Sequence, residues 1–75
     1  MTAFKIIGTE TKGEVYIKVN SQYNNINADK VIVAEHVSAR LFGTINELVI
    51  KKGGQVWLHG TIKGKIENDG KLFTY

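Results

Sequence analysis

The sequence predicts an all-β protein, a short parallel β-solenoid of three to four coils with an imperfect 17-residue repeat. The string Leu-x-Gly-Thr-Ile occurs twice, as Leu41 to Ile45 and as Leu58 to Ile62. Apolar residues alternate with polar ones in short runs bounded by glycine, which is typical of strands with one buried face. The chain has eight Gly and no Pro, which suits a fold in which most backbone N–H groups pair with a neighbouring strand.

The N-terminal part of the chain matches the repeat only weakly. We expect a single domain over residues 1–75, with an N-terminal strand or cap over 1–13 and the coils over 14–75. The segment from Phe4 to Gly8 has the pattern of a strand or cap. The triplet from Val15 to Ile17 resembles the triplet from Val31 to Val33 at an offset of 16, whereas the Asn-rich stretch from Asn20 to Asn27 does not follow the repeat.

The central part of the chain carries the clearest repeat, with residues 31–45 aligned on residues 48–62 without a gap. In a solenoid this offset stacks Leu41 on Leu58 and Ile45 on Ile62, about 4.8 Å apart along the axis. A third, shorter copy follows with one residue deleted. It places Ile66 under Ile50, Gly70 under Gly54 and Leu72 under Val56. Like residues would then form continuous apolar columns, as repeat proteins require.

Two other folds compete with the solenoid. Residues Val37, Leu41, Ile45 and Leu48 also fit helical spacing, but a helix would hold Gly43 and Thr44 in its interior at a cost of about 1–2 kcal/mol. The same Gly-Thr-Ile string also recurs at Gly60, where no long helix fits. A small OB-like or SH3-like barrel could be built from the same Val/Ile-rich strands, although barrel strands need not be self-similar.

The composition argues against catalysis. Zero Cys excludes disulfides, thiolate metal sites and cysteine nucleophiles. His36 and His59 fall in different columns of the repeat, and neither lies in a metal-binding motif. The carboxylates are scattered, with no two in one column of this register, and the segment from Gly60 to Lys65 lacks the spacing of a phosphate loop. We therefore expect no enzyme, no catalytic residue, no metal site and no cofactor.

Charge and hydropathy indicate a cytoplasmic protein with a mildly basic surface. The net charge is +3, no apolar run is long enough for a transmembrane helix, and the first residues do not resemble a secretory signal. Between Glu47 and Glu67 the only charged residues are lysines. We therefore predict a weak anion-binding site at Lys51, Lys52, Lys63 and Lys65; alternatively, these lysines keep the turns soluble and block strand edges.

The outward positions of the repeat predict an interface. If Leu41 and Leu58 point inward, their neighbours Arg40, Phe42, Trp57 and His59 point outward. The offset puts Arg40 over Trp57 for a cation–π contact and Phe42 over His59. Trp and Arg are common in binding hot spots, although the patch could instead pack under the N-terminal segment or shield the sheet.

The C-terminal segment predicts a second contact. It ends in Leu72, Phe73 and Tyr75 without a charged cap, so an open solenoid end would expose unpaired strand edges there. We therefore expect a homo-oligomer or a complex with another protein.

The segment from Trp57 to Ile66, followed by Asn68-Asp69-Gly70, resembles the glycine–valine rhythm of bactofilins, the bacterial polymer-forming cytoskeletal proteins. The resemblance covers about residues 31–73. It implies a right-handed parallel β-helix with a triangular section and an apolar lumen, end-to-end polymerisation without nucleotide, and no catalytic residues.

The most direct functional expectation is a non-catalytic structural or protein-interaction module that self-associates through its ends or its aromatic patch. One alternative is nucleic-acid binding, with exposed Trp57, Tyr16 and Tyr23 beside the four lysines. Another is a toxin-neutralising immunity or inhibitor protein, which the size permits but no residue favours.

Overall fold

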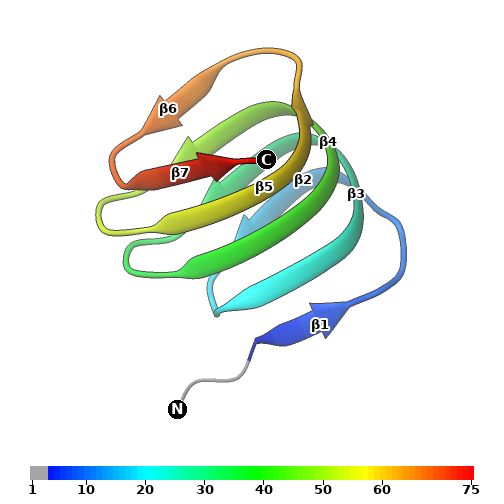
Figure 1. Ribbon diagram of the computed structural model, residues 1–75, viewed down its shortest axis with the longest axis horizontal. Coiled ribbons are helices and arrows are strands. Elements are labelled where there is room, and N and C mark those ends of the chain that lie inside the picture. Colours follow the sequence, from blue (N-terminus) through cyan, green and yellow to red (C-terminus); the bar gives the residue numbers. More distant parts are fainter. Residues whose placement is uncertain (1–3) are drawn as a thin grey trace.

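A computed structural model, which describes residues 4–75, shows a β-solenoid of about four turns in which every strand pairing is parallel (Figure 1). Its seven strands are β1 (Lys5–Ile7), β2 (Thr11–Ile17), β3 (Ser21–Val33), β4 (Ser38–Ile50), β5 (Gln55–Ile62), β6 (Ile66–Asn68) and β7 (Lys71–Thr74). The predicted solenoid is confirmed. The helical and barrel alternatives are wrong, since residues 4–75 contain no helix and their strands stack in coils rather than closing into a barrel.

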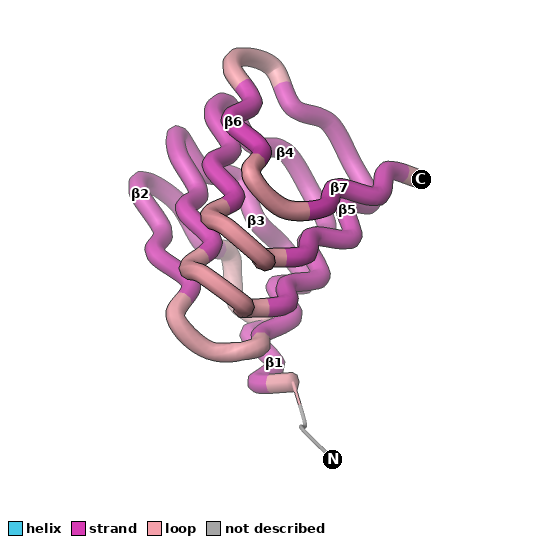
Figure 2. The backbone as a smooth tube through the Cα atoms, turned by 90° about the vertical axis from the view of Figure 1, so that its left-hand side faces the viewer, coloured by secondary structure: helices cyan, strands magenta, loops and turns pink. Residues whose placement is uncertain are grey.

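Each coil has two arms, which are visible in Figure 2 as two stacks of strands. The first arm stacks the strands in the order β1, β3, β4, β5 and β7. The second arm stacks β2, the C-terminal half of β3, the C-terminal half of β4, and β6. Strands β3 and β4 belong to both arms because each bends midway, near Ile26 in β3 and Gly43 in β4, which are register partners. The two arms enclose the apolar core.

The core consists of side chains that stack directly on one another from coil to coil. Leu41 pairs with Leu58 and Ile45 with Ile62, as the sequence repeat predicts. Leu41, Ile45 and Leu48 are fully buried, and so are Val31 and Leu58 next to them in the columns. This stacking explains the like-on-like repeat, because an apolar side chain in one coil is covered only by its equivalents above and below.

The Asn-rich stretch, expected to lie outside the repeat, is part of β3 and pairs with β4. It accommodates one extra residue as an irregularity in the register between Tyr23 and Ile26. The extra residue brings Ile26 and Ala28 to the buried side and leaves the neighbouring asparagines exposed. The offset of 16 between β2 and β3, with Val15 opposite Val31 and Ile17 opposite Val33, agrees with the sequence alignment.

The predicted position of Ile66 is wrong by two residues, because Ile66 pairs with Leu48 and Asn68 pairs with Ile50. Three residues, 63–65, link Ile62 to Ile66, whereas two residues link Ile45 to Leu48 in the coil below. The turn between β6 and β7 is shorter than the turn between β4 and β5. This compensates for the extra residue, so Leu72 pairs with Val56 as predicted. The third copy therefore combines an insertion and a longer deletion, which together resemble a single deletion in the sequence.

The turns between coils contain a residue in the left-handed conformation. His36 has a φ of 60° and Gly53, in the turn of the next coil, has a φ of 74°. The two turns are in contact, since the backbone N–H of His36 donates to the carbonyl of Lys52 at 3.2 Å. Glycine adopts this conformation without cost, whereas a residue with a Cβ is strained in it.

Replacing His36 with glycine should therefore raise the free energy of unfolding by about 1 kcal/mol, because the strain of the positive φ disappears. Urea denaturation followed by circular dichroism measures the change. Glu35→Gly is the matched control in the same turn: it gains only chain entropy in the unfolded state and should lower stability. Equal losses in both variants would contradict the strain at His36.

Candidate functional site

The outward side of the first arm carries a continuous surface, called here the aromatic face. It is made of residues that alternate with the buried core positions on β3, β4, β5 and β7, with Tyr75 following directly. Register pairs connect Arg40 to Trp57, Trp57 to Phe73, and Phe42 to His59. The aromatic face comprises Gln22, Arg40, Phe42, Trp57, His59, Phe73 and Tyr75.

The rings of the aromatic face form two stacked ladders along the solenoid axis. In one ladder the centroids of Phe42 and His59 lie 4.5 Å apart and those of His59 and Tyr75 lie 4.6 Å apart, with interplanar angles of 9° and 11°. In the other, Trp57 and Phe73 stack at 5.6 Å and 16°. The outward patch and the aromatic C-terminus, which the sequence suggested as two contacts, thus lie on one surface.

The cation–π contact predicted between Arg40 and Trp57 is wrong. The Arg40 guanidinium lies instead over the ring of Phe4, at 4.9 Å from its centroid. Phe4 precedes β1 and reaches Arg40 from outside the repeat, so the offset of 17 between Arg40 and Trp57 could not reveal this ring. The N-terminal segment therefore contacts one edge of the aromatic face, as one of the alternatives proposed, while the remaining residues stay accessible.

A hollow of about 520 Å³ lies on the aromatic face, lined by Gln22, Arg40, Phe42, Trp57, His59 and Tyr75. No Asp or Glu occurs in the segments 20–25, 37–42, 54–59 and 70–75, which form this arm from β3 onward. The side chains that line the hollow include the Arg40 guanidinium, the His59 imidazole and the Gln22 amide. The hollow thus favours an anionic or neutral ligand over a cationic one.

The C-terminal end of the solenoid is open. β6 pairs with β4 and β7 pairs with β5, and among the described residues no strand pairs with the other edge of either. Ile66 is 48% exposed although it continues a core column, and Ile62 and Leu72 are partly exposed. At the other end the second arm is covered, since Val15 is 9% and Ile17 1% exposed, and Ile7 of the first arm is partly exposed like Leu72. Apolar core surface is therefore accessible chiefly at the C-terminal end.

Strand β7 also presents free hydrogen-bonding groups at this end. The N–H groups of Lys71 and Tyr75 donate to the carbonyls of Gly54 and Leu58 at 2.9 and 3.1 Å. Because backbone N–H groups alternate in direction along a strand, those of Leu72 and Thr74 point away from β5. Leu72 itself points toward the core, so its predicted interface role is confined to the open end.

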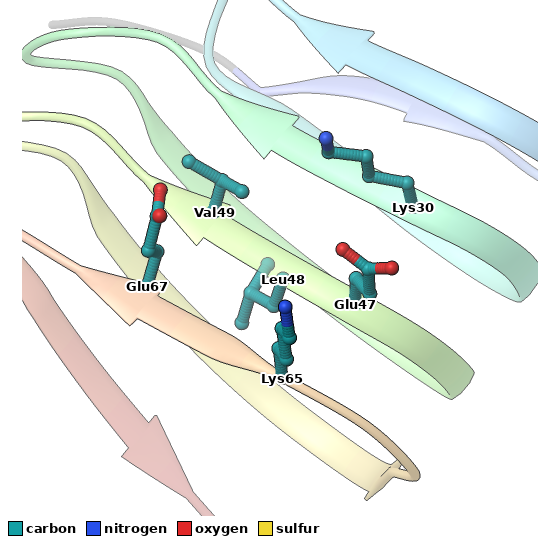
Figure 3. A pocket seen from close by; sticks show the side chains of 6 residues that line it. All are labelled: Lys30, Glu47, Leu48, Val49, Lys65 and Glu67. Carbon is teal, nitrogen blue, oxygen red and sulfur yellow. The ribbon is translucent and has the colours of Figure 1, made fainter.

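The second arm carries a column of alternating charge that the sequence alignment missed. Glu14 pairs with Lys30, and Lys30 with Glu47. Lys65 continues this column, because it precedes Ile66, the partner of Leu48. Figure 3 shows Lys30, Glu47 and Lys65 around a pocket of about 240 Å³, which Leu48, Val49 and Glu67 also line. Correct placement of Ile66 on Leu48 would have revealed the column.

The four lysines predicted as a weak anion site lie in separate turns. Lys51 and Lys52 follow β4, whereas Lys63 and Lys65 lie between β5 and β6. Lys65 has the Glu47 carboxylate in the adjacent coil, which weakens its attraction for an anion. Within residues 4–75, one ion pair is closer than 4.0 Å. It joins the Lys12 Nζ and Glu10 Oε1 atoms, which lie 3.6 Å apart.

Two tyrosines expected to lie beside Trp57 are elsewhere. Tyr23 pairs with Leu41 and packs against the core, where desolvation raises the pKa of its hydroxyl. Tyr16 is exposed on the second arm, with the Lys18 ammonium 5.5 Å from its ring centroid. The predicted set of Trp57, Tyr16 and Tyr23 is therefore not assembled on one surface.

The two histidines lie in different parts of the solenoid. No group of three or more His, Asp or Glu residues that could hold a metal occurs within the part of the chain that the structure describes. His59 stacks between Phe42 and Tyr75, and His36 lies in an exposed turn.

Comparison with known proteins found no match to a protein-family model, a curated protein or a solved structure. Over residues 4–75 the structure has no helix that is long and apolar enough to cross a membrane.

Proposed function

We propose that this protein is a non-catalytic assembly module that associates with a second copy of itself through its open C-terminal end. The observation that carries the proposal is the exposure of core surface there, above all of Ile66, combined with the free edges of β6 and β7. Unpaired parallel strands over an apolar core are a ready template for pairing with another chain. The resemblance to bactofilins, which assemble end to end, supports the same function.

The shape of the end suggests how two copies fit. Strand β7 lies one level beyond β5 on the first arm, whereas β6 is the last strand of the second arm. The end therefore has a step. If two copies are related by a two-fold axis perpendicular to the solenoid, the raised β7 of each copy fills the recess above β6 of the other. A two-fold axis is the commonest symmetry of small homo-oligomers, and here it makes the β6–β7 pairing between copies antiparallel.

The side chains of the two strands are complementary in this arrangement. An antiparallel register that places Glu67 opposite Lys71 of a second copy also places Ile66 opposite Leu72. The first pair joins opposite charges on the outer surface, and the second joins two apolar residues of the core side. Cross-strand pairs of both kinds stabilise a sheet. Each two-fold contact would contain both pairs twice.

Light scattering coupled to size-exclusion chromatography tests the proposal at tens of micromolar protein. The expected mass is twice the 8.4 kDa of the chain. Ile66→Lys, which puts a charge on the exposed core surface, and Thr74→Pro, which removes a free N–H without breaking a bond to β5, should both give monomers. Ile6→Lys is the matched control, because Ile6 is 64% exposed on β1 at the opposite end.

A monomeric unmodified protein would overturn the proposal. Dissociation by Ile6→Lys as complete as by Ile66→Lys would retain self-association but replace the two-fold contact with a head-to-tail one. Engineered cysteines distinguish the two directly, since the chain has no Cys of its own. A mixture of Glu67→Cys and Lys71→Cys proteins should form a mixed disulfide, because opposed Cα atoms about 5 Å apart suit a disulfide. A mixture of Lys65→Cys and Glu14→Cys should form one only if the copies stack head to tail.

A further inference from the structure

The aromatic face has a charge distribution unlike that of the second arm. From β3 onward the first arm carries Arg40, His59 and Lys71 with no Asp or Glu, whereas the second arm alternates Glu and Lys. The hollow of about 520 Å³ lies between the two ring ladders of this face and is open to solvent. A ligand that enters it meets a guanidinium, an imidazole and the amide of Gln22, with ring edges on either side. An anionic group is the best complement to these partners.

The two ladders also leave ring faces unpaired at their ends. Within each ladder the faces of neighbouring rings cover one another, at 4.5 to 5.6 Å between centroids. The first rings, Phe42 and Trp57, and the last rings, Phe73 and Tyr75, each have one neighbour in their ladder. The last rings are the more exposed, at 40% and 72%, whereas the first are partly buried. A planar ring added to either ladder would continue the existing stacking. The ligand should therefore combine planar rings with negative charge.

The dimensions of the face suggest a polymer rather than a single ring. From Gln22 on β3 to Phe73 on β7 the face crosses three strand spacings, or about 14 Å. At about 3.4 Å per nucleotide, a strand of about four nucleotides covers this length, and its bases can stack only on the ring faces at the ends of the ladders. Proteins that bind single strands without sequence preference combine a basic groove with aromatic rings on which bases stack. An acidic peptide would use the cations but would leave the free ring faces without a partner.

We infer that the aromatic face binds single-stranded nucleic acid, with bases stacked on Tyr75 and Phe73 and phosphates beside Arg40 and Lys71. The site is distinct from the sequence-based proposal, because it excludes Tyr16, Tyr23 and the four lysines of the turns. It does not depend on the proposed self-association but competes with it, because the two-fold contact lays β6 of a second copy over β7 and covers the free ring faces of Phe73 and Tyr75. Binding is therefore measured on the monomeric Ile66→Lys variant.

The single tryptophan of the chain is a built-in reporter, because Trp57 lines the hollow and no other Trp contributes fluorescence. An oligonucleotide of about eight thymidines or uridines, titrated at about 50 mM salt, should quench Trp57 emission with a saturable curve. The oligonucleotide concentration at half-maximal quenching should rise with salt. Phosphate contacts release counterions on binding, so added salt weakens binding. An abasic oligonucleotide of equal charge and a polyglutamate peptide of equal length should bind at least about fivefold more weakly, because neither offers bases to stack.

Substitutions assign the binding to the face. Tyr75→Ala should weaken binding at least about fivefold, the lower limit for losing one base–ring stack, whereas Tyr75→Phe should keep it. Arg40→Gln should weaken binding and lower the salt dependence. Lys52→Gln removes the same charge from a distant turn and should change the midpoint by less than about twofold.

Several outcomes would overturn the inference: no quenching at any accessible concentration, equal binding of the abasic strand or of polyglutamate, or equal loss in Arg40→Gln and Lys52→Gln. Equal binding of polyglutamate would identify an acidic protein surface as the partner. Failure on the folded, monomeric Ile66→Lys variant, with normal dimerisation of the unmodified protein, would remove this inference and leave the proposed assembly function intact.

Discussion

Replacing Leu48 with alanine is expected to lower the free energy of unfolding by about 3–5 kcal/mol. Leu48 is fully buried and stacks between Val31 and Ile66 in a core column. The strands on both sides are held by backbone hydrogen bonds, so the cavity left by the substitution can collapse only partly. For a domain of this size the total stability is about 4–11 kcal/mol, and the variant should be close to unfolding at room temperature.

Urea denaturation followed by far-ultraviolet circular dichroism measures this loss. Val49 provides a matched control on the same strand, because it pairs with Ile32 on the outer side and is only half-buried. Val49→Ala should cost about 1 kcal/mol or less. Similar losses at positions 48 and 49 would mean that the lumen does not carry the stability of the coil, contrary to the stacking described above.

Replacing Gly43 with alanine should cost at least about 3 kcal/mol, for two independent reasons. Gly43 has a φ of 141°, and an added Cβ would collide with the backbone carbonyl oxygen of Ile26 in the coil below. The contact is with backbone rather than with a flexible side chain, so the strand would have to move and would lose register bonds. This is the bend at which β4 passes from the first arm to the second.

Two other glycines separate the contributions at Gly43. Gly13 has a φ of 78° but nothing within 4 Å of an added Cβ, so Gly13→Ala reports backbone strain alone, about 1 kcal/mol. Gly8 has neither feature, and Gly8→Ala should be neutral or slightly stabilising. The denaturation midpoint should therefore be highest for Gly8→Ala, lower for Gly13→Ala and lowest for Gly43→Ala. A Gly43→Ala protein as stable as Gly13→Ala would contradict the close approach of the coils.

The sequence predicted the fold where two coils have equal length. Between β4 and β5 every residue pairs at an offset of 17, so aligned strings such as Leu-x-Gly-Thr-Ile give the register directly. The sequence did not predict which residues pair where two coils have turns of different length. Ile66 satisfies an apolar column whether it lies on Leu48 or on Ile50, and an apolar pattern alone cannot distinguish these positions. The extra residue near Tyr23 is hidden for the same reason, because a local irregularity shifts the pattern without changing its composition.

The candidate site was predictable in part. Alternation around Leu41 and Leu58 correctly placed Arg40, Phe42, Trp57 and His59 on the outside. The union of this patch with Phe73 already follows from the predicted pairing of Leu72 with Val56, because that pairing puts Phe73 on Trp57. The contact of Arg40 with Phe4 could not be read from the repeat at all, since Phe4 precedes β1 and approaches β4 across an intervening coil.

The central position of β3 and β4 has a consequence for how the molecule opens. These two strands alone among β1 to β7 have partners along both edges over most of their length, whereas β1, β2, β6 and β7 are bonded on one edge. Local unfolding should therefore begin at the terminal coils and reach the middle last, as expected when each repeat contacts only its neighbours. The open end and the last rings of the aromatic face lie in the part that opens most readily. They can rearrange around a partner while the central coils keep their structure.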